Sequence, residues 1–108
     1  MTYKGVATPV GDLDIAELRQ SLGLTQRDAA LLMEVALNTW ARWERGELQL
    51  HPARAQQLHR LLQLVNQYGE GPFWGLGIDG IRSVLDGLTL NEALLAHGLD
   101  AYGAPLRR

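Results

Sequence analysis

The feature that most restricts this chain is segment 25–46, TQRDAALLMEVALNTWARWERG, which has the pattern of two short helices joined by a tight turn. Thr25 is a typical helix N-cap, and Asp28 follows it at capping-box spacing. Segment 34–36 interrupts the helical pattern, and segment 37–45 resumes it with polar residues on one face. The two helices are too short to be stable alone, so we expect them to pack on a larger helical domain.

Apolar residues at helical spacing extend on both sides of this segment. The stripe in segment 12–22 predicts a helix over about Asp12 to Leu22, with Asp12 and Asp14 favouring its start and Gly23 stopping it. Gly46 is suited to end the helix over 37–45, and Pro52 is suited to the first turn of another. That fourth helix has a predicted buried stripe of Leu58, Leu61, Leu62 and Val65.

The strongest boundary signal is segment 68–72, Tyr-Gly-Glu-Gly-Pro, which should stop the fourth helix. We therefore expect an N-terminal arm over 1–11, a four-helix domain over 12–68, a Gly/Pro-rich linker over 69–80 and a C-terminal extension over 81–108. Ile81, Val84, Leu85 and Leu88 mark one short helix of the extension. Thr89 and Glu92 have capping-box spacing before a second, which Gly98 should end. Without any strand pattern, the predicted fold is all-α.

The amino-acid composition restricts the classes of function that we expect for this chain. The chain has no cysteine, and His51, His59 and His97 lack a metal-ligand spacing, so we expect no metal and no cofactor. No apolar run approaches the roughly 18 residues of a membrane span, and no signal peptide is evident, which favours a cytoplasmic protein without membrane contact. The net charge of −2 argues against unselective coating of nucleic acid, although segment 42–60 carries four arginines and is locally basic.

An enzyme is not expected. Segment 75–80, Gly-Leu-Gly-Ile-Asp-Gly, matches a nucleotide-binding glycine pattern by letter, but that motif requires a preceding strand and a βαβ unit. We interpret it as a flexible loop. No arrangement of nucleophile and base is persuasive either.

The sequence resembles the helix-turn-helix family of phage repressors and xenobiotic-response-type bacterial regulators over about residues 13–65. The family pattern stands here as Leu18-Arg19, then Gly23-Leu24-Thr25-Gln26, then Trp43-Glu44-Arg45-Gly46. The resemblance implies an ion pair between Arg19 and Glu44, which would fix the angle between two helices through a bidentate contact. Two positions depart from the pattern: Glu34 replaces the usual turn glycine, and Ala36 replaces a capping serine or threonine.

The resemblance also implies which residues contact DNA. Gln26 would bind a phosphate or base from the start of the second helix. Trp40 falls at the inward position and Trp43 at a semi-buried one, so we expect both in the core. Asn38 and Arg42 lie four residues apart, share a helix face and match adenine and guanine edges, while Leu37 and Thr39 could touch a thymine methyl or a phosphate. The alternative is that Asn38 and Arg42 are only solvated polar residues.

We therefore expect a transcriptional regulator, a repressor that binds a short palindrome in double-stranded DNA as a homodimer through the helix over 37–45 in the major groove. The extension is too apolar to be a flexible tail, so it either packs on the monomer core or forms a dimer or partner surface. The candidate surface residues are Phe73, Trp74, Ile81, Leu85, Leu94 and Leu95. The alternative is an antitoxin or phage accessory protein whose tail binds a cognate toxin or another protein. The stretch from Asn38 through Arg42 to the His51-Pro52 loop most resembles the DNA-binding halves of certain toxin-antitoxin repressors.

Overall fold

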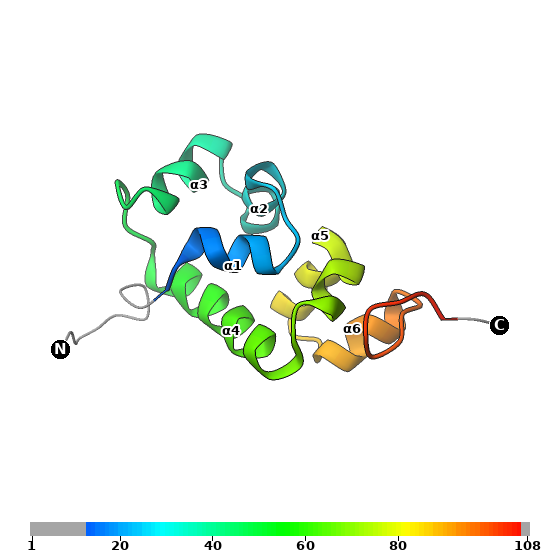
Figure 1. The fold of residues 1–108 in the computed structure, drawn as a ribbon. Coiled ribbons are helices and arrows are strands. Elements are labelled where there is room, and N and C mark those ends of the chain that lie inside the picture. The colour runs from blue at the N-terminus through cyan, green and yellow to red at the C-terminus, as the bar shows by residue number, and fades with distance from the viewer. Residues whose placement is uncertain (1–12, 107–108) are drawn as a thin grey trace.

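The computed structural model describes residues 13–106, which form six helices (Figure 1). The helices are α1 (Ile15–Ser21), α2 (Gln26–Met33), α3 (Leu37–Glu44), α4 (Pro52–Tyr68), α5 (Gly71–Leu85) and α6 (Leu90–Ala96). Within this part of the chain the only β pairing is an isolated bridge between Leu99 and Pro105. The all-α prediction is confirmed. The predicted arm over 1–11 and the helix start at Asp12 lie outside the described residues.

The helix starts follow the capping chemistry of the sequence. The side chains of Thr25 and Thr89 each accept a hydrogen bond from the backbone amide three residues on, and the carboxylates of Asp28 and Glu92 each accept one from the backbone amide of the cap residue. Both capping boxes are therefore present. Pro52 occupies the first turn of α4, as predicted, and the side chain of its cap residue His51 accepts from the Ala53 amide at 3.2 Å.

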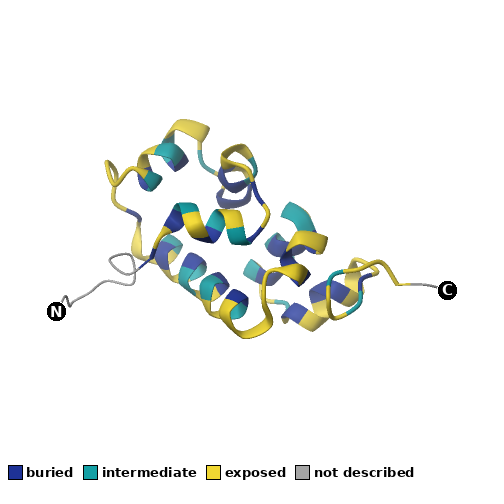
Figure 2. Ribbon diagram, viewed as in Figure 1, coloured by how far each residue is buried: buried dark blue, intermediate teal, exposed yellow. Residues whose placement is uncertain are grey.

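One continuous hydrophobic core joins all six helices (Figure 2). On the N-terminal side it contains Leu18 of α1 and Leu58 and Leu61 of α4, each no more than 2% exposed. On the C-terminal side it contains Phe73 and Ile81 of α5, both fully buried. The C-terminal helices therefore extend the core of the first four.

The predicted linker over 69–80 is wrong. Tyr68 does end α4, but α5 begins at Gly71 and runs through the glycine-rich segment to Leu85. Gly77, with φ 67° and ψ −167°, is the one residue inside α5 with non-helical backbone angles, and the helix is kinked there. Gly75 is required by packing, since a Cβ there would lie 2.0 Å from the carbonyl oxygen of Gly103. Burial of the apolar residues between the glycines outweighs their low helix propensity.

The predicted dimer or partner surface also needs correction. Phe73 and Ile81 are 0% exposed and Leu94 is 2% exposed, because α5 packs against α2 and α4 and α6 packs against α5. Leu85 is half-buried against the same core. Only Trp74 and Leu95 of the predicted set are well exposed, at 61% and 68%.

Candidate nucleic-acid interface

The turn between α2 and α3 holds a strained residue. Glu34 is left-handed, with φ 58° and ψ 44°, and is the only described residue other than glycine with a positive φ. The turn is closed by the Val35 amide, which donates to the Ala30 carbonyl at 3.0 Å. A left-handed conformation costs a non-glycine residue about 1 kcal/mol. Ala36 caps α3 without a side-chain hydrogen bond. The two departures from the family pattern therefore leave a strained residue in the turn and a helix start without a side-chain cap.

Glu44, the last residue of α3, ties three helices together. Its carboxylate accepts from Arg19 Nε at 2.7 Å, from Gln26 Nε2 at 3.0 Å and from the Trp40 indole. The predicted Arg19–Glu44 pair is present, but it is not bidentate. Arg19 instead directs Nη1 to the Leu24 carbonyl at 3.0 Å. The guanidinium thus holds the α1–α2 loop as well as α3, which sequence spacing alone could not reveal.

The environment of Glu44 favours its ionised form. Burial by itself raises the pKa of this carboxyl group, but the hydrogen bonds from Arg19, Gln26 and Trp40 and the charge of Arg19 outweigh it. The pKa of Glu44 therefore lies below its ordinary value. Because this carboxylate is charged at neutral pH, it can anchor α3 there.

The inner face of α3 is formed by its tryptophans. Trp40 is 2% exposed and Trp43 is 8% exposed, and their rings meet edge to face with centroids 5.8 Å apart. Both belong to the core, as predicted. Because neither ring presents a free face, these tryptophans cannot serve as platforms for stacking bases.

The outer face of α3 presents the predicted DNA-contacting side chains. Asn38 and Arg42 are exposed and one helical turn apart, and Leu37 is 43% exposed at the start of the helix. Thr39 is half-buried at the edge of this face. The structure thus brings four of the five predicted contact residues together on one short helix.

An acidic side chain stands beside this face. Glu47 lies 3.9 Å from Arg42 Nε and pairs with Arg45 through two hydrogen bonds, at 2.8 and 3.0 Å. The hydrogen bonds from Arg45 hold the pKa of Glu47 below its ordinary value. The arrangement partly neutralises the basic end of α3.

A family model described as a helix-turn-helix domain matches residues 14–68, just over half of the chain. The chain belongs to this helix-turn-helix family. Its α2 and α3 are the two helices of the motif, and the matched range covers α1 to α4. Membership of this family implies DNA binding by the matched domain.

A shorter match relates the chain to the Type II methyltransferase M.MspI of Moraxella sp, with 44% identity over 36 residues. These residues are 33% of this chain, which spans only 9% of the length of the methyltransferase. No solved structure matches the chain.

Gln26 occupies the first position of α2, the first helix of the motif, but its amide nitrogen donates to Glu44. This contact makes Gln26 part of the scaffold that orients α3, a role that was not predicted. A phosphate contact by its second amide hydrogen stays a prediction.

The described part of the helix-turn-helix protein was compared with two other kinds of site, a metal site and a membrane-spanning helix. Residues 13–106 contain no group of three or more histidine, cysteine, aspartate or glutamate side chains that could hold a metal ion. None of the helices in this range is long and apolar enough to cross a membrane.

Proposed function

We propose that this protein is a sequence-specific transcriptional regulator, a repressor without enzymatic activity, which binds a short palindrome as a dimer with α3 in the major groove. The observation that supports this most directly is the two-faced character of α3. Trp40 and Trp43 anchor one face in the core, while Asn38 and Arg42 project from the other. A rigidly anchored helix with an exposed polar face suits base reading.

The chemistry of the exposed face fits DNA bases. An arginine can donate two hydrogen bonds to guanine, and an asparagine can pair with adenine through one donor and one acceptor. Leu37 and Thr39 are placed to touch a thymine methyl group or a phosphate. An eight-residue helix such as α3 is about 12 Å long, which suits a major groove of similar width.

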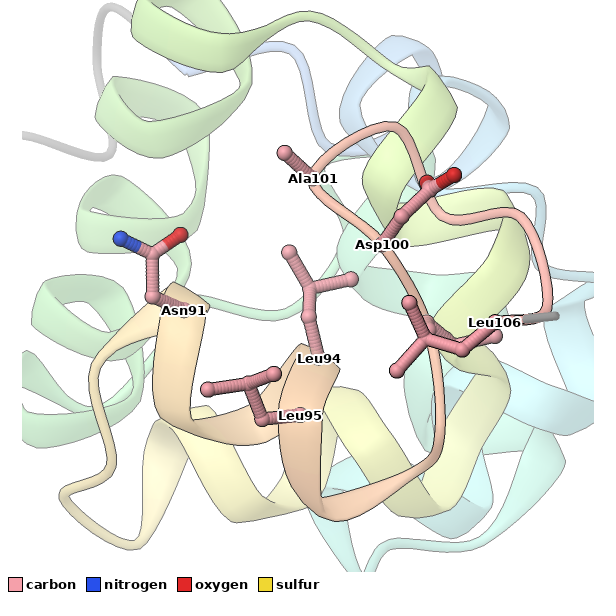
Figure 3. A pocket seen from close by; sticks show the side chains of 7 residues that line it. Asn91, Leu94, Leu95, Asp100, Ala101 and Leu106 are labelled. Carbon is pink, nitrogen blue, oxygen red and sulfur yellow. The ribbon is translucent and has the colours of Figure 1, made fainter. Parts of the chain in front are cut away.

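For the dimer contact we propose the surface between α6 and segment 99–106. It contains an apolar groove of about 260 Å³, lined by Asn91, Leu94, Leu95, Leu99, Asp100, Ala101 and Leu106 (Figure 3). Leu95 and Leu106 are 68% and 51% exposed on its rim. The groove lies at the end of the molecule away from α3 (Figure 1), so pairing of two copies there leaves both reading helices accessible.

Base reading is tested by selection from random duplex DNA at near-physiological salt, followed by affinity measurements on the enriched site. Asn38→Ala or Arg42→Ala should cost about 1–3 kcal/mol on that site and much less on random DNA. Asn66→Ala, which removes an exposed asparagine from α4, is the control and should change neither affinity. Failure of the wild-type protein to enrich any sequence would refute sequence-specific binding.

Light scattering of the protein as it elutes from a size-exclusion column tests the dimer by measuring the molar mass at a protein concentration of tens of micromolar. Leu95→Glu should convert a dimer to a monomer, because a charge would be buried against the partner's leucines. Leu31→Glu, at a leucine of α2 that is 56% exposed, should leave the dimer intact. A monomeric wild-type protein would contradict the homodimer.

The same groove favours a second candidate function, an antitoxin or phage accessory protein whose extension binds another protein. This role predicts a monomer that forms a complex of fixed stoichiometry with a co-expressed partner. Leu95→Glu should then abolish the complex without changing affinity for DNA. A homodimer that buries Leu95 would contradict this candidate.

A further inference from the structure

Arg82 of α5 reaches the turn between α2 and α3, although it lies outside the matched helix-turn-helix range. Its Nη1 donates to Glu34 Oε2 at 3.0 Å, and its Nη2 donates to the Leu31 carbonyl at 2.9 Å. One planar guanidinium therefore joins the side chain of the turn residue to the backbone at the end of α2. No other described ion pair connects the extension to this turn.

The turn has two physical problems that Arg82 answers. The carbonyl groups at the end of α2 carry the negative end of the helix dipole, and Glu34 adds a carboxylate at the same place. Glu34 is also left-handed, so other backbone conformations compete with the one observed. The positive charge of Arg82 offsets both negative groups, and its two hydrogen bonds hold Glu34 in place.

A second contact of α5 lies before α2, at the end of α1 and in the loop that follows it. Trp74 Nε1 donates to the Ser21 carbonyl at 2.8 Å, and the indole lies over Gly23, where a Cβ would come within 2.8 Å of Trp74 Cδ1. Through Trp74 and Arg82, α5 thus contacts the loop before α2 and the turn after it. Because α2 and α3 pack against each other, the position of the turn sets how α3 is presented.

The Arg82–Glu34 pair contributes little to global stability. The two side chains are 34% and 70% exposed, and ion pairs so accessible to water are weak. Loss of Arg82 should therefore loosen the turn without unfolding the protein. The effect of Arg82 on the turn can therefore be measured separately from any effect on global stability.

We propose that Arg82 is a positioning residue for DNA reading, which acts through Glu34 and Leu31 to fix the orientation of α3. The extension is then part of the reading unit and not only a dimer element. This inference depends on the proposed function. It predicts that sequence discrimination falls when Arg82 is removed, although Arg82 itself touches no base.

The test compares Arg82→Ala in three full-length backgrounds: wild type, Glu34→Gln and Glu34→Gly. Glutamine removes the charge that Arg82→Ala would unmask near DNA but keeps the left-handed strain, whereas glycine removes both. Affinity for the selected site should fall about tenfold in the first two backgrounds and less than twofold in the glycine background. Affinity for random DNA should not change in any of them.

Loss of the effect in the Glu34→Gln background would overturn the inference, because charge repulsion would then explain it. An equal loss on random DNA would overturn it as well. If the wild-type protein selects no sequence, the proposed function fails independently. Hydrogen exchange of the Val35 amide in DNA-free protein then decides whether Arg82 holds the turn: faster exchange in Arg82→Ala supports this, and unchanged exchange refutes it.

Discussion

At the scale of single residues, Glu44 connects three helices through one side chain. Its carboxylate accepts hydrogen bonds from α1, α2 and α3, and it is shielded together with Arg19, the side chains being 9% and 15% exposed. A shielded charge with three donors is well satisfied, whereas the same donors without it would be left unpaired. Glu44 therefore controls the geometry of the motif more than its surface neighbours do.

Glu44→Gln should lower the free energy of unfolding at pH 7 by about 2 kcal/mol, because hydrogen bonds to a charged acceptor are replaced by weaker ones. The variant should also change the response to acid. The folded-state pKa of Glu44 is below its ordinary value of 4.5, so its stabilisation is complete above that pH and is lost as pH falls through the lower folded pKa.

Urea unfolding of wild type and Glu44→Gln between pH 7 and pH 3 measures this difference. The two stabilities should converge as Glu44 becomes protonated. Glu70→Gln is the control, since Glu70 is exposed and makes no side-chain capping bond. Parallel curves for wild type and Glu44→Gln would contradict the assignment.

At the scale of the elements, the short helices depend on their caps and on packing. α1, α2, α3 and α6 have seven or eight residues each, which is too short for independent stability. α2 and α6 both begin with a complete capping box, yet only α2 belongs to the DNA-binding motif. This pair of helices separates the effect of a cap on folding from its effect on DNA binding.

Thr25→Ala and Thr89→Ala should each lower the free energy of unfolding by about 1 kcal/mol, because each removes an N-cap hydrogen bond. Only Thr25→Ala should also weaken DNA binding, since the start of α2 faces the proposed phosphate contacts. Thermal unfolding and fluorescence anisotropy with labelled duplex measure the two effects. Equal DNA affinity of the two variants would argue against a contact by the start of α2.

In the molecule as a whole, the C-terminal extension completes the domain. Its backbone approaches α5 closely enough that Gly75 and Gly103 leave no room for a side chain. The same segment supplies Leu99 to the core and Leu106 to the groove of the proposed dimer surface. Docking of residues 99–106 on α5 therefore shapes that surface.

Gly75→Ala should destabilise the protein by about 1–3 kcal/mol and displace residues 99–106, because its Cβ would clash with the Gly103 backbone. Gly71→Ala is the matched control in the same helix: its Cβ would lie 3.3 Å from the Tyr102 carbonyl oxygen and needs only a small adjustment. Amide chemical shifts of residues 98–106 and urea unfolding report both changes. Equal effects of the two variants would contradict the close packing.

The sequence by itself determined the elements whose signals are local. Capping residues, the proline of α4 and apolar spacing located the four helices up to residue 68, and the polar face of α3 followed from side chains one turn apart. The Arg19–Glu44 contact came from the family resemblance, since residues so distant in sequence cannot be paired by spacing.

The tertiary structure decided what depends on contacts between distant segments. It alone showed that segment 71–80 is helical apart from the kink at Gly77, because burial against other helices overcomes a glycine-rich composition. It showed that Phe73, Ile81 and Leu94 belong to the core, which an apolar pattern cannot distinguish from an exposed partner surface. It also placed Arg82 at the turn. Local sequence specifies where helices start and stop. Packing between distant segments decides which side chains of those helices form the core and which stay exposed.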